Sequence, residues 1–141
     1  MLKVFKADSS AESLPLPIVS ATVQAGFPSP ADHYLDKTLD LNELLVSHPA
    51  ATFFVRVVGD SMQNAGISSG DILIVDRSLE VTDNAIIIAV VQGEFTVKRL
   101  LKKEGRLFLA PENPSYPLFQ IGPESDFQVW GIVTYVIHKT Q

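Results

Sequence analysis

Ser61 and Lys98 are the two residues whose types and settings best fit catalysis. Ser61 lies in the run Gly59-Asp60-Ser61-Met62, directly after a segment that predicts a strand. Gly59 permits a sharp turn, and backbone N–H groups at the start of a following helical turn would point at an anion near the serine. Acyl transfer needs such donors for its oxyanion. The competing interpretation is a turn serine that only caps a short helix, which is the commoner role of this pattern.

Lys98 is the candidate base, because a serine hydroxyl is a weak nucleophile when nothing assists it. It lies in a predicted strand, Glu94–Leu101, which the tight turn Gln92-Gly93 joins to the apolar segment Asn84–Val91. We expect this hairpin inside the fold, where partial desolvation disfavours the ammonium form of lysine. A neutral amine can act as a general base. The alternative is a lysine that extends to solvent from an edge strand.

Other catalytic chemistries find little support. The chain has no cysteine, which excludes a disulfide framework, a thiolate metal site and a cysteine nucleophile. No two histidines stand at a helical ligand spacing, so no metal is expected. His33 and His48 are interpreted as surface groups. His138 does not complete an esterase motif, because Tyr135 stands where that motif places an aspartate.

The composition argues against nucleic acid and membrane as primary partners. Eleven Lys and Arg against sixteen Asp and Glu give a net charge of −5, whereas phosphate binding needs clustered basic residues. The longest strongly apolar run, Ala85–Val91, is far shorter than the roughly eighteen residues of a membrane span. Val23-Gln24-Ala25 resembles a secretory cleavage site, but Pro15 and Pro17 interrupt the apolar stretch before it, so export is disfavoured.

The 141 residues are expected to form one domain, 39–141, preceded by a flexible arm, 1–38. The arm is rich in proline, which resists regular structure. A short helix is predicted over Asp40–Ser47, with Asp40 as its N-cap and Leu41, Leu44 and Leu45 on one apolar face.

After the helix the chain predicts strands, so the fold class is mainly β, barrel-like, with one short helix. The predicted strands are Thr52–Val58, Asp71–Asp76, Asn84–Val91, Glu94–Leu101, Arg106–Ala110, Pro117–Ile121 and Phe127–His138. Asp71 and Asp76 are expected to stabilise the turns at the two ends of their strand. The run Pro111-Glu112-Asn113-Pro114 predicts a loop. The last strand has apolar residues on both faces, so either a two-fold dimer buries the surplus or its own chain covers both sides.

Five segments together resemble the family of self-cleaving serine peptidases that includes UmuD, the LexA repressor and the lambda-type phage repressors. They are Ala25-Gly26-Phe27-Pro28-Ser29-Pro30-Ala31, Asp40-Leu41-Asn42, Gly59-Asp60-Ser61-Met62, Gly70-Asp71 and Gly93-Glu94-Phe95-Thr96-Val97-Lys98. The resemblance implies the LexA-type C-terminal peptidase domain. It also implies that Ser61 is the nucleophile, Lys98 the general base and Ala25–Gly26 the self-cleaved bond. Many UmuD proteins have Cys before the scissile Gly, where this chain has Ala25, as LexA does.

The resemblance further implies a cytoplasmic protein of the SOS response that needs no cofactor. A RecA filament on single-stranded DNA would stimulate cleavage, and the shortened homodimer would join a UmuC-type polymerase in error-prone translesion synthesis. The proline-rich arm cannot form a helix-turn-helix, so no sequence-specific DNA binding is expected. The alternative function is a non-catalytic interaction module of a DNA-repair complex, in which Ser61 merely caps a turn.

Overall fold

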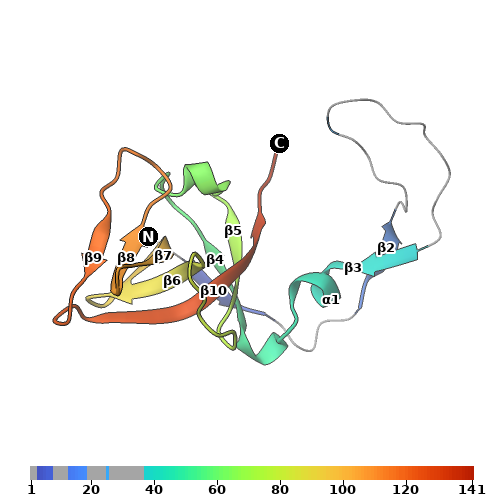
Figure 1. The fold of residues 1–141 in the computed structure, drawn as a ribbon. Coiled ribbons are helices and arrows are strands. Elements are labelled where there is room, and N and C mark those ends of the chain that lie inside the picture. The colour runs from blue at the N-terminus through green and yellow to red at the C-terminus, as the bar shows by residue number, and fades with distance from the viewer. Residues whose placement is uncertain (1–2, 8–12, 19–24, 26–36) are drawn as a thin grey trace. The chain divides into compact units, whose positions relative to one another are not determined.

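The computed structural model describes residues 3–7, 13–18, 25 and 37–141. The chain divides into two compact units, one of Met1–Ser9 with His48–Gln141 and the other of Ser10–Ser47. Figure 1 shows the strands of the larger unit and the small strand pair of the other. The predicted division between residues 38 and 39 stays a prediction.

The larger unit is built on one eight-stranded sheet in which every strand pairs antiparallel with its neighbours. In spatial order its strands are β1 (Lys3–Lys6), β4 (Thr52–Arg56), β5 (Ile72–Asp76), β10 (Phe127–Ile137), β6 (Ile86–Val91), β7 (Glu94–Lys103), β8 (Arg106–Ala110) and β9 (Phe119–Ile121). Two short 3₁₀ turns, η1 (Pro49–Ala51) and η2 (Gln63–Ala65), interrupt the loops. The prediction of a mainly β fold is confirmed, and all seven predicted strands are present with small shifts at their ends.

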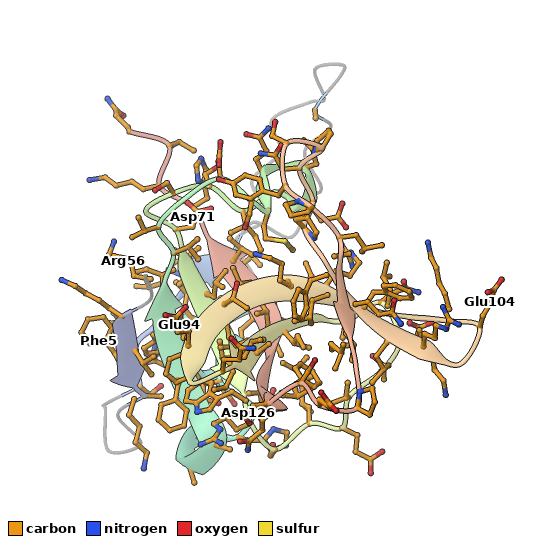
Figure 2. The ribbon with its side chains drawn as sticks, turned by 90° about the vertical axis from the view of Figure 1, so that its left-hand side faces the viewer. Phe5, Arg56, Asp71, Glu94, Glu104 and Asp126 are labelled. Atoms are coloured by element: carbon orange, nitrogen blue, oxygen red, sulfur yellow. The ribbon has the colours of Figure 1, made fainter. Side chains whose placement is uncertain are left out.

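The strand β1 was not anticipated from the sequence. It lies in the segment expected to be an arm, and it pairs with β4 at the edge of the sheet, with Val4 opposite Val55 and Phe5 opposite Phe54. Figure 2 shows Phe5 at this margin, while Glu104 marks the tip of the β7–β8 hairpin. All four residues of β1 are exposed, so tertiary pairing and not an apolar pattern places the strand here.

The strand β10 joins the two halves of the sheet. Its first half pairs with β6 and its second half with β5, and the register shifts once in each half. Such irregularities bend a strand. Gly131 lies between the two shifts, and a Cβ atom there would lie 2.5 Å from Val75 Cγ1, so a larger residue forces its neighbours to shift.

Two apolar clusters cover the opposite faces of β6. Ile88 packs with Val55, Met62 and other buried residues on one side, whereas Ile87 and Ala89 belong to a second cluster. The apolar segment is therefore covered on both faces, which confirms the prediction that its hairpin lies inside the fold. The strand that carries Lys98 pairs with β6 and is held next to this core.

The smaller unit contains the antiparallel pair β2 (Pro15–Ile18) and β3 (Lys37–Asp40), followed by α1 (Leu41–Leu45). The Asp40 carboxylate caps the helix by accepting a hydrogen bond from Asn42 N–H at 3.0 Å. The prediction of an N-cap at Asp40 is confirmed, but the helix ends two residues before Ser47. Leu41 and Leu44 are 56% and 46% exposed, so the predicted apolar face is not buried.

Candidate active site

The loop that carries Ser61 turns sharply after β4. Gly59 has a φ of +106°, a conformation that favours glycine, and its N–H donates to Ser69 Oγ at 3.1 Å. Met62, directly after the serine, is 1% exposed and belongs to the core cluster. The 3₁₀ turn η2 follows at once. The predicted glycine turn and the short helical turn after it are both present.

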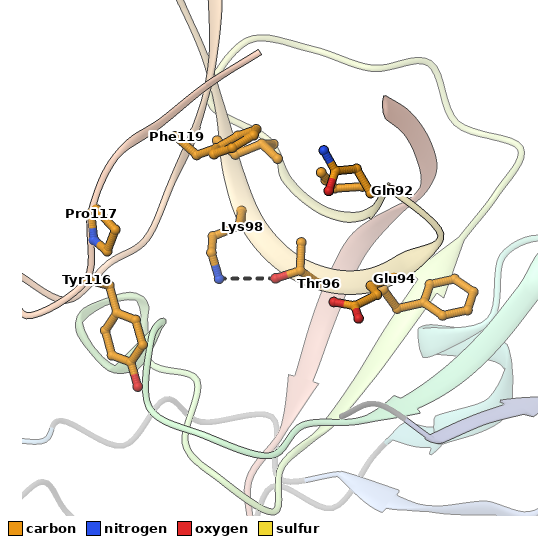
Figure 3. A pocket seen from close by; sticks show the side chains of 10 residues that line it. Gln92, Glu94, Thr96, Lys98, Tyr116, Pro117 and Phe119 are labelled. Carbon is orange, nitrogen blue, oxygen red and sulfur yellow. Dashed lines mark hydrogen bonds between the residues drawn. The ribbon is translucent and has the colours of Figure 1, made fainter. Parts of the chain in front are cut away.

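Lys98 is placed by the β6–β7 hairpin, where it lies opposite Ile87. The turn residues Gln92 and Gly93 both have positive φ, 50° and 80°, as a two-residue type I′ hairpin turn requires. Alternation along β7 directs Lys98 and Thr96 to one face, and Figure 3 shows the hydrogen bond between their side chains.

The structure brings the two candidate residues together. Lys98 Nζ lies 3.1 Å from Ser61 Oγ, although the two residues are 37 positions apart in the chain. The same nitrogen lies 3.2 Å from Thr96 Oγ1 and 3.1 Å from the carbonyl oxygen of Val97. These three oxygens fix the amine next to the serine hydroxyl.

Partial burial lowers the pKa of Lys98 below its usual value of 10.5. The cause is desolvation, which penalises the ammonium and leaves the neutral amine unaffected. Near neutral pH, the fraction of molecules in which Lys98 is neutral is therefore larger than it would be for a fully exposed lysine. An amine in this form can accept the proton of a serine hydroxyl at hydrogen-bond distance.

A cavity of about 490 Å³ lies beside the lysine, and Figure 3 shows the side chains that line it. Gln92, Thr96 and Lys98 line one side of it, and Tyr116 and Phe119 come from the segment between β8 and the end of β9. The lining is both apolar and polar. A cavity of this kind, next to a nucleophile and a base, suits the side chains of an extended peptide.

The segment from Pro111 to Tyr116 holds the Ser61 loop, a role that the sequence did not reveal. The amide of Asn113 donates to Asp60 O at 2.9 Å, and the phenol of Tyr116 donates to Asp60 Oδ1 at 2.6 Å. The backbone N–H of Glu112 donates to Ser61 O at 2.8 Å. The sequence predicted only a loop here; its polar residues between two prolines were the available signal.

The described histidines bond to aspartates instead of to the serine. His138 Nδ1 lies 2.6 Å from Asp71 Oδ1, and His48 Nδ1 lies 2.6 Å from Asp76 Oδ2. Both aspartates are buried and also accept hydrogen bonds from turn residues, which confirms their predicted role in turns. The histidine partners were missed. His33 lies outside the described residues.

The hydrogen bonds to the Asp76 carboxyl group change its pKa. Burial alone would raise its pKa, but hydrogen bonds from the Ser78 hydroxyl and from His48, with the Ser78 N–H, hold the pKa below its usual 3.8. Asp76 is therefore ionised at neutral pH and contributes to the turn at the end of β5.

The predicted cleavage site is placed only in part. Ala25 belongs to the smaller unit and is exposed, while Gly26 lies outside the described residues. The assignment of the bond stays a prediction. Among the described residues no helix is long and apolar enough to cross a membrane, and no group of three metal-binding side chains gathers.

A turn serine whose Oγ lies 3.1 Å from the amine of a half-buried lysine is an arrangement that suits a serine hydrolase. Residues 17–134 match the family described as Peptidase S24-like. The chain belongs to this family of self-cleaving serine peptidases.

The curated relatives agree with this assignment. The protein SamA of Salmonella typhimurium is 48% identical over 125 residues, which cover 89% of this chain and 86% of SamA. ImpA of Salmonella typhimurium is 45% identical and MucA of Escherichia coli 41% identical, each over 133 residues that cover 94% of this chain and 90% of the relative. The LexA repressor of Paracidovorax citrulli is 36% identical over 90% of this chain and 56% of its own length. SamA, ImpA and MucA are homologues of UmuD, so the resemblance seen in the sequence is confirmed.

Proposed function

We propose that this chain is a peptidase that cuts its own Ala25–Gly26 bond, with Ser61 as nucleophile and Lys98 as general base. The observation that carries the proposal is the 3.1 Å distance between Lys98 Nζ and Ser61 Oγ, together with the burial that lowers the pKa of Lys98. Membership of a family of self-cleaving serine peptidases supports it.

In the proposed reaction the neutral amine of Lys98 accepts the Ser61 hydroxyl proton while Oγ attacks the carbonyl carbon of Ala25. The tetrahedral intermediate collapses, the bond to the Gly26 nitrogen breaks, and the Lys98 ammonium returns the proton to that nitrogen. The same lysine then takes a proton from a water molecule that attacks the carbonyl carbon of the ester. The bond from that carbon to Ser61 Oγ breaks, Lys98 returns the proton to Oγ, and the freed Ala25 carboxyl group loses its own proton to solvent. Thr96 Oγ1 and Val97 O accept hydrogen bonds from the transient ammonium and stabilise it.

The cavity beside Lys98 is the proposed place for the arm. An extended strand of the chain can lay its side chains against Tyr116 and Phe119 while a small residue sits at the serine. Glycine after the cut lets the backbone approach the nucleophile closely. Ala25 and Gly26 suit such a site because both are small.

The wider role that we propose follows the relatives. A RecA filament on single-stranded DNA would favour the conformer with the arm docked. The product that begins at Gly26 would act in the cytoplasm as a homodimer with a UmuC-type polymerase in SOS mutagenesis. Similarity to SamA, ImpA, MucA and LexA supports this role.

In β10, Ile137 remains 44% exposed, which gives a dimer apolar surface to bury. Sedimentation that gives a monomer mass at every concentration would contradict the dimer.

The experiment that tests the cleavage is incubation of the pure chain, with and without a RecA filament, followed by mass spectrometry of the products. A new species that starts at Gly26 is expected. It should be absent from Ser61→Ala and from Lys98→Ala, and the double variant should be no worse than either single one, because the two residues act as a unit. Lys103→Ala, an exposed lysine at the end of the same strand, is the matched control and should cut normally. Cutting by Ser61→Ala would overturn the assignment, and no cutting by any form would favour a non-catalytic interaction module.

A further inference from the structure

We infer that Tyr116 and Asn113 are positioning residues for the reaction, because they hold Asp60, the residue directly before the nucleophile. The inference deepens the proposed function and rests on it. Neither residue needs to touch the reacting atoms. Their action is to fix the backbone from which Ser61 projects.

Asp60 is held at two points by the same segment. The phenol of Tyr116 donates to its side-chain Oδ1 at 2.6 Å, and the amide of Asn113 donates to its main-chain oxygen at 2.9 Å. Bonds to both the side chain and the backbone restrict the rotation of the peptide that enters Ser61. The N–H of Gln63 also donates to Asp60 O, at 3.2 Å, and closes the turn on the other side of the serine.

The backbone of the same segment holds Ser61 and the residues after it. Glu112 N–H donates to Ser61 O, and Glu112 O accepts from Asn64 N–H, both at 2.8 Å. The two loops are therefore joined before and after the nucleophile. The Ser61 side chain accepts a hydrogen bond from Lys98, so the direction of Oγ toward that amine depends on how well this backbone is fixed.

The segment is in turn tied to the strand that carries the base. Arg99, next to Lys98 on β7, forms an ion pair through its Nε with the carboxylate of Glu112 and donates to Asn84 O. Asn113 is 7% exposed, and its Oδ1 accepts from Ser115 N–H at 2.9 Å. One hydrogen-bonded network thus sets the distance between the amine on β7 and the hydroxyl on the loop.

A role in positioning explains features that a role in stability does not. Tyr116 is 41% exposed and Asp60 is exposed, so their hydrogen bond contributes little to the stability of the fold. The hydrogen bond from Tyr116 to Asp60 raises the pKa of the phenol above 10.0. The phenol therefore keeps its proton, and its hydrogen bond to Asp60, to a higher pH than a free tyrosine would. A displacement of the nucleophile by about 1 Å can lower a rate by about a hundredfold.

The test compares Tyr116→Phe with Tyr135→Phe, which removes the same hydroxyl from an exposed tyrosine of β10. Two rates are measured on the full chain: self-cleavage, and the reaction of Ser61 with diisopropyl fluorophosphate, a small probe that does not need the arm. We expect Tyr116→Phe to be about tenfold slower in both. Its melting temperature should match that of the unchanged chain, and Tyr135→Phe should leave both rates unchanged.

Variants of Asp60 test the residue that accepts the hydrogen bond from Tyr116. Asp60→Ala should slow both rates, and the pair Asp60→Ala with Tyr116→Phe should be no slower than Asp60→Ala alone, because both changes remove one bond. Asp60→Asn keeps an acceptor oxygen and should retain most of the rate. Asn113→Ala should slow both rates as well. Because Asn113 is buried, both rates are measured at a temperature at which circular dichroism shows that this variant is folded.

The outcomes distinguish a failure of the inference from a failure of the proposed function on which it rests. Normal rates for Tyr116→Phe would overturn the inference while leaving the proposed function intact. Slow self-cleavage with a normal reaction toward the probe would also overturn it, because Tyr116 would then act by contacting the arm in the cavity. If the unchanged chain neither cuts itself nor reacts at Ser61, the proposed function fails, and the inference fails with it.

Discussion

The rate of self-cleavage without RecA should rise with pH until Lys98 has lost its proton. Only the neutral amine can accept the Ser61 proton, and burial lowers the pKa of Lys98. A lysine with the usual pKa of 10.5 is neutral in about one molecule per thousand at pH 7.5, and each unit by which burial lowers the pKa multiplies that share about tenfold. The logarithm of the rate should therefore climb with a slope of about one and level off below pH 10.5.

The assay is the initial rate of product formation from about pH 6 to about pH 10.5, with mass spectrometry to identify Gly26 at the new terminus. Circular dichroism at each pH verifies that the chain is folded. The contribution of Lys98 to the stability of the folded state also rises over this window, because the unfolded chain binds the Lys98 proton more tightly than the folded chain. A loss of activity at high pH thus cannot come from Lys98 itself through unfolding.

Lys98→Arg is the sharpest control for this prediction. A guanidinium remains charged throughout the pH range of the assay, so this variant should not cut at any pH, although it keeps a cation in place. A histidine base would give a rate that levels off by about pH 8. A plateau reached by pH 8 that disappears in His138→Ala and persists in Lys98→Ala would refute the reasoning.

Three further predictions concern the arm, the sheet and a turn. Gly26→Val should block cleavage with little change in melting temperature, since an arm residue adds little to the core; processing at the normal rate would show that another bond is cut. Gly131→Ala should destabilise the domain by about 1–3 kcal/mol in urea unfolding, because the new methyl group would lie 2.5 Å from Val75 Cγ1. The lowered pKa of Asp76 gives stability that is present above pH 3.8 and is lost as the pH falls through the lower folded value, so Asp76→Asn should flatten the stability profile there. An unchanged profile would mean that Asp76 does not contribute.

The local features of this protein could be predicted from the sequence. The strand β8 has the bounds that its residues predict, and the β6–β7 hairpin turns at Gln92 and Gly93, where two positive φ angles are needed. The turn at Gly59 and the candidate pair Ser61 and Lys98 were also visible, because a glycine turn and a lysine beside an apolar strand are signals within a few residues. The helix was predicted two residues too long, since the ends of helices are weakly specified by pattern.

Only the tertiary structure decided which distant residues meet. Tyr116 bonds to Asp60 across 56 positions of the chain, and His138 bonds to Asp71 across 67. Neither partner carries a local sign of the other, because such contacts arise when the sheet brings separate loops together. The strand β1 is a further case, since its four exposed residues show no buried pattern and pairing with the edge of β4 alone places it. Residue type and spacing thus indicated the chemistry, while the 3.1 Å approach of Lys98 to Ser61 depends on how a hairpin and a loop pack on a shared core.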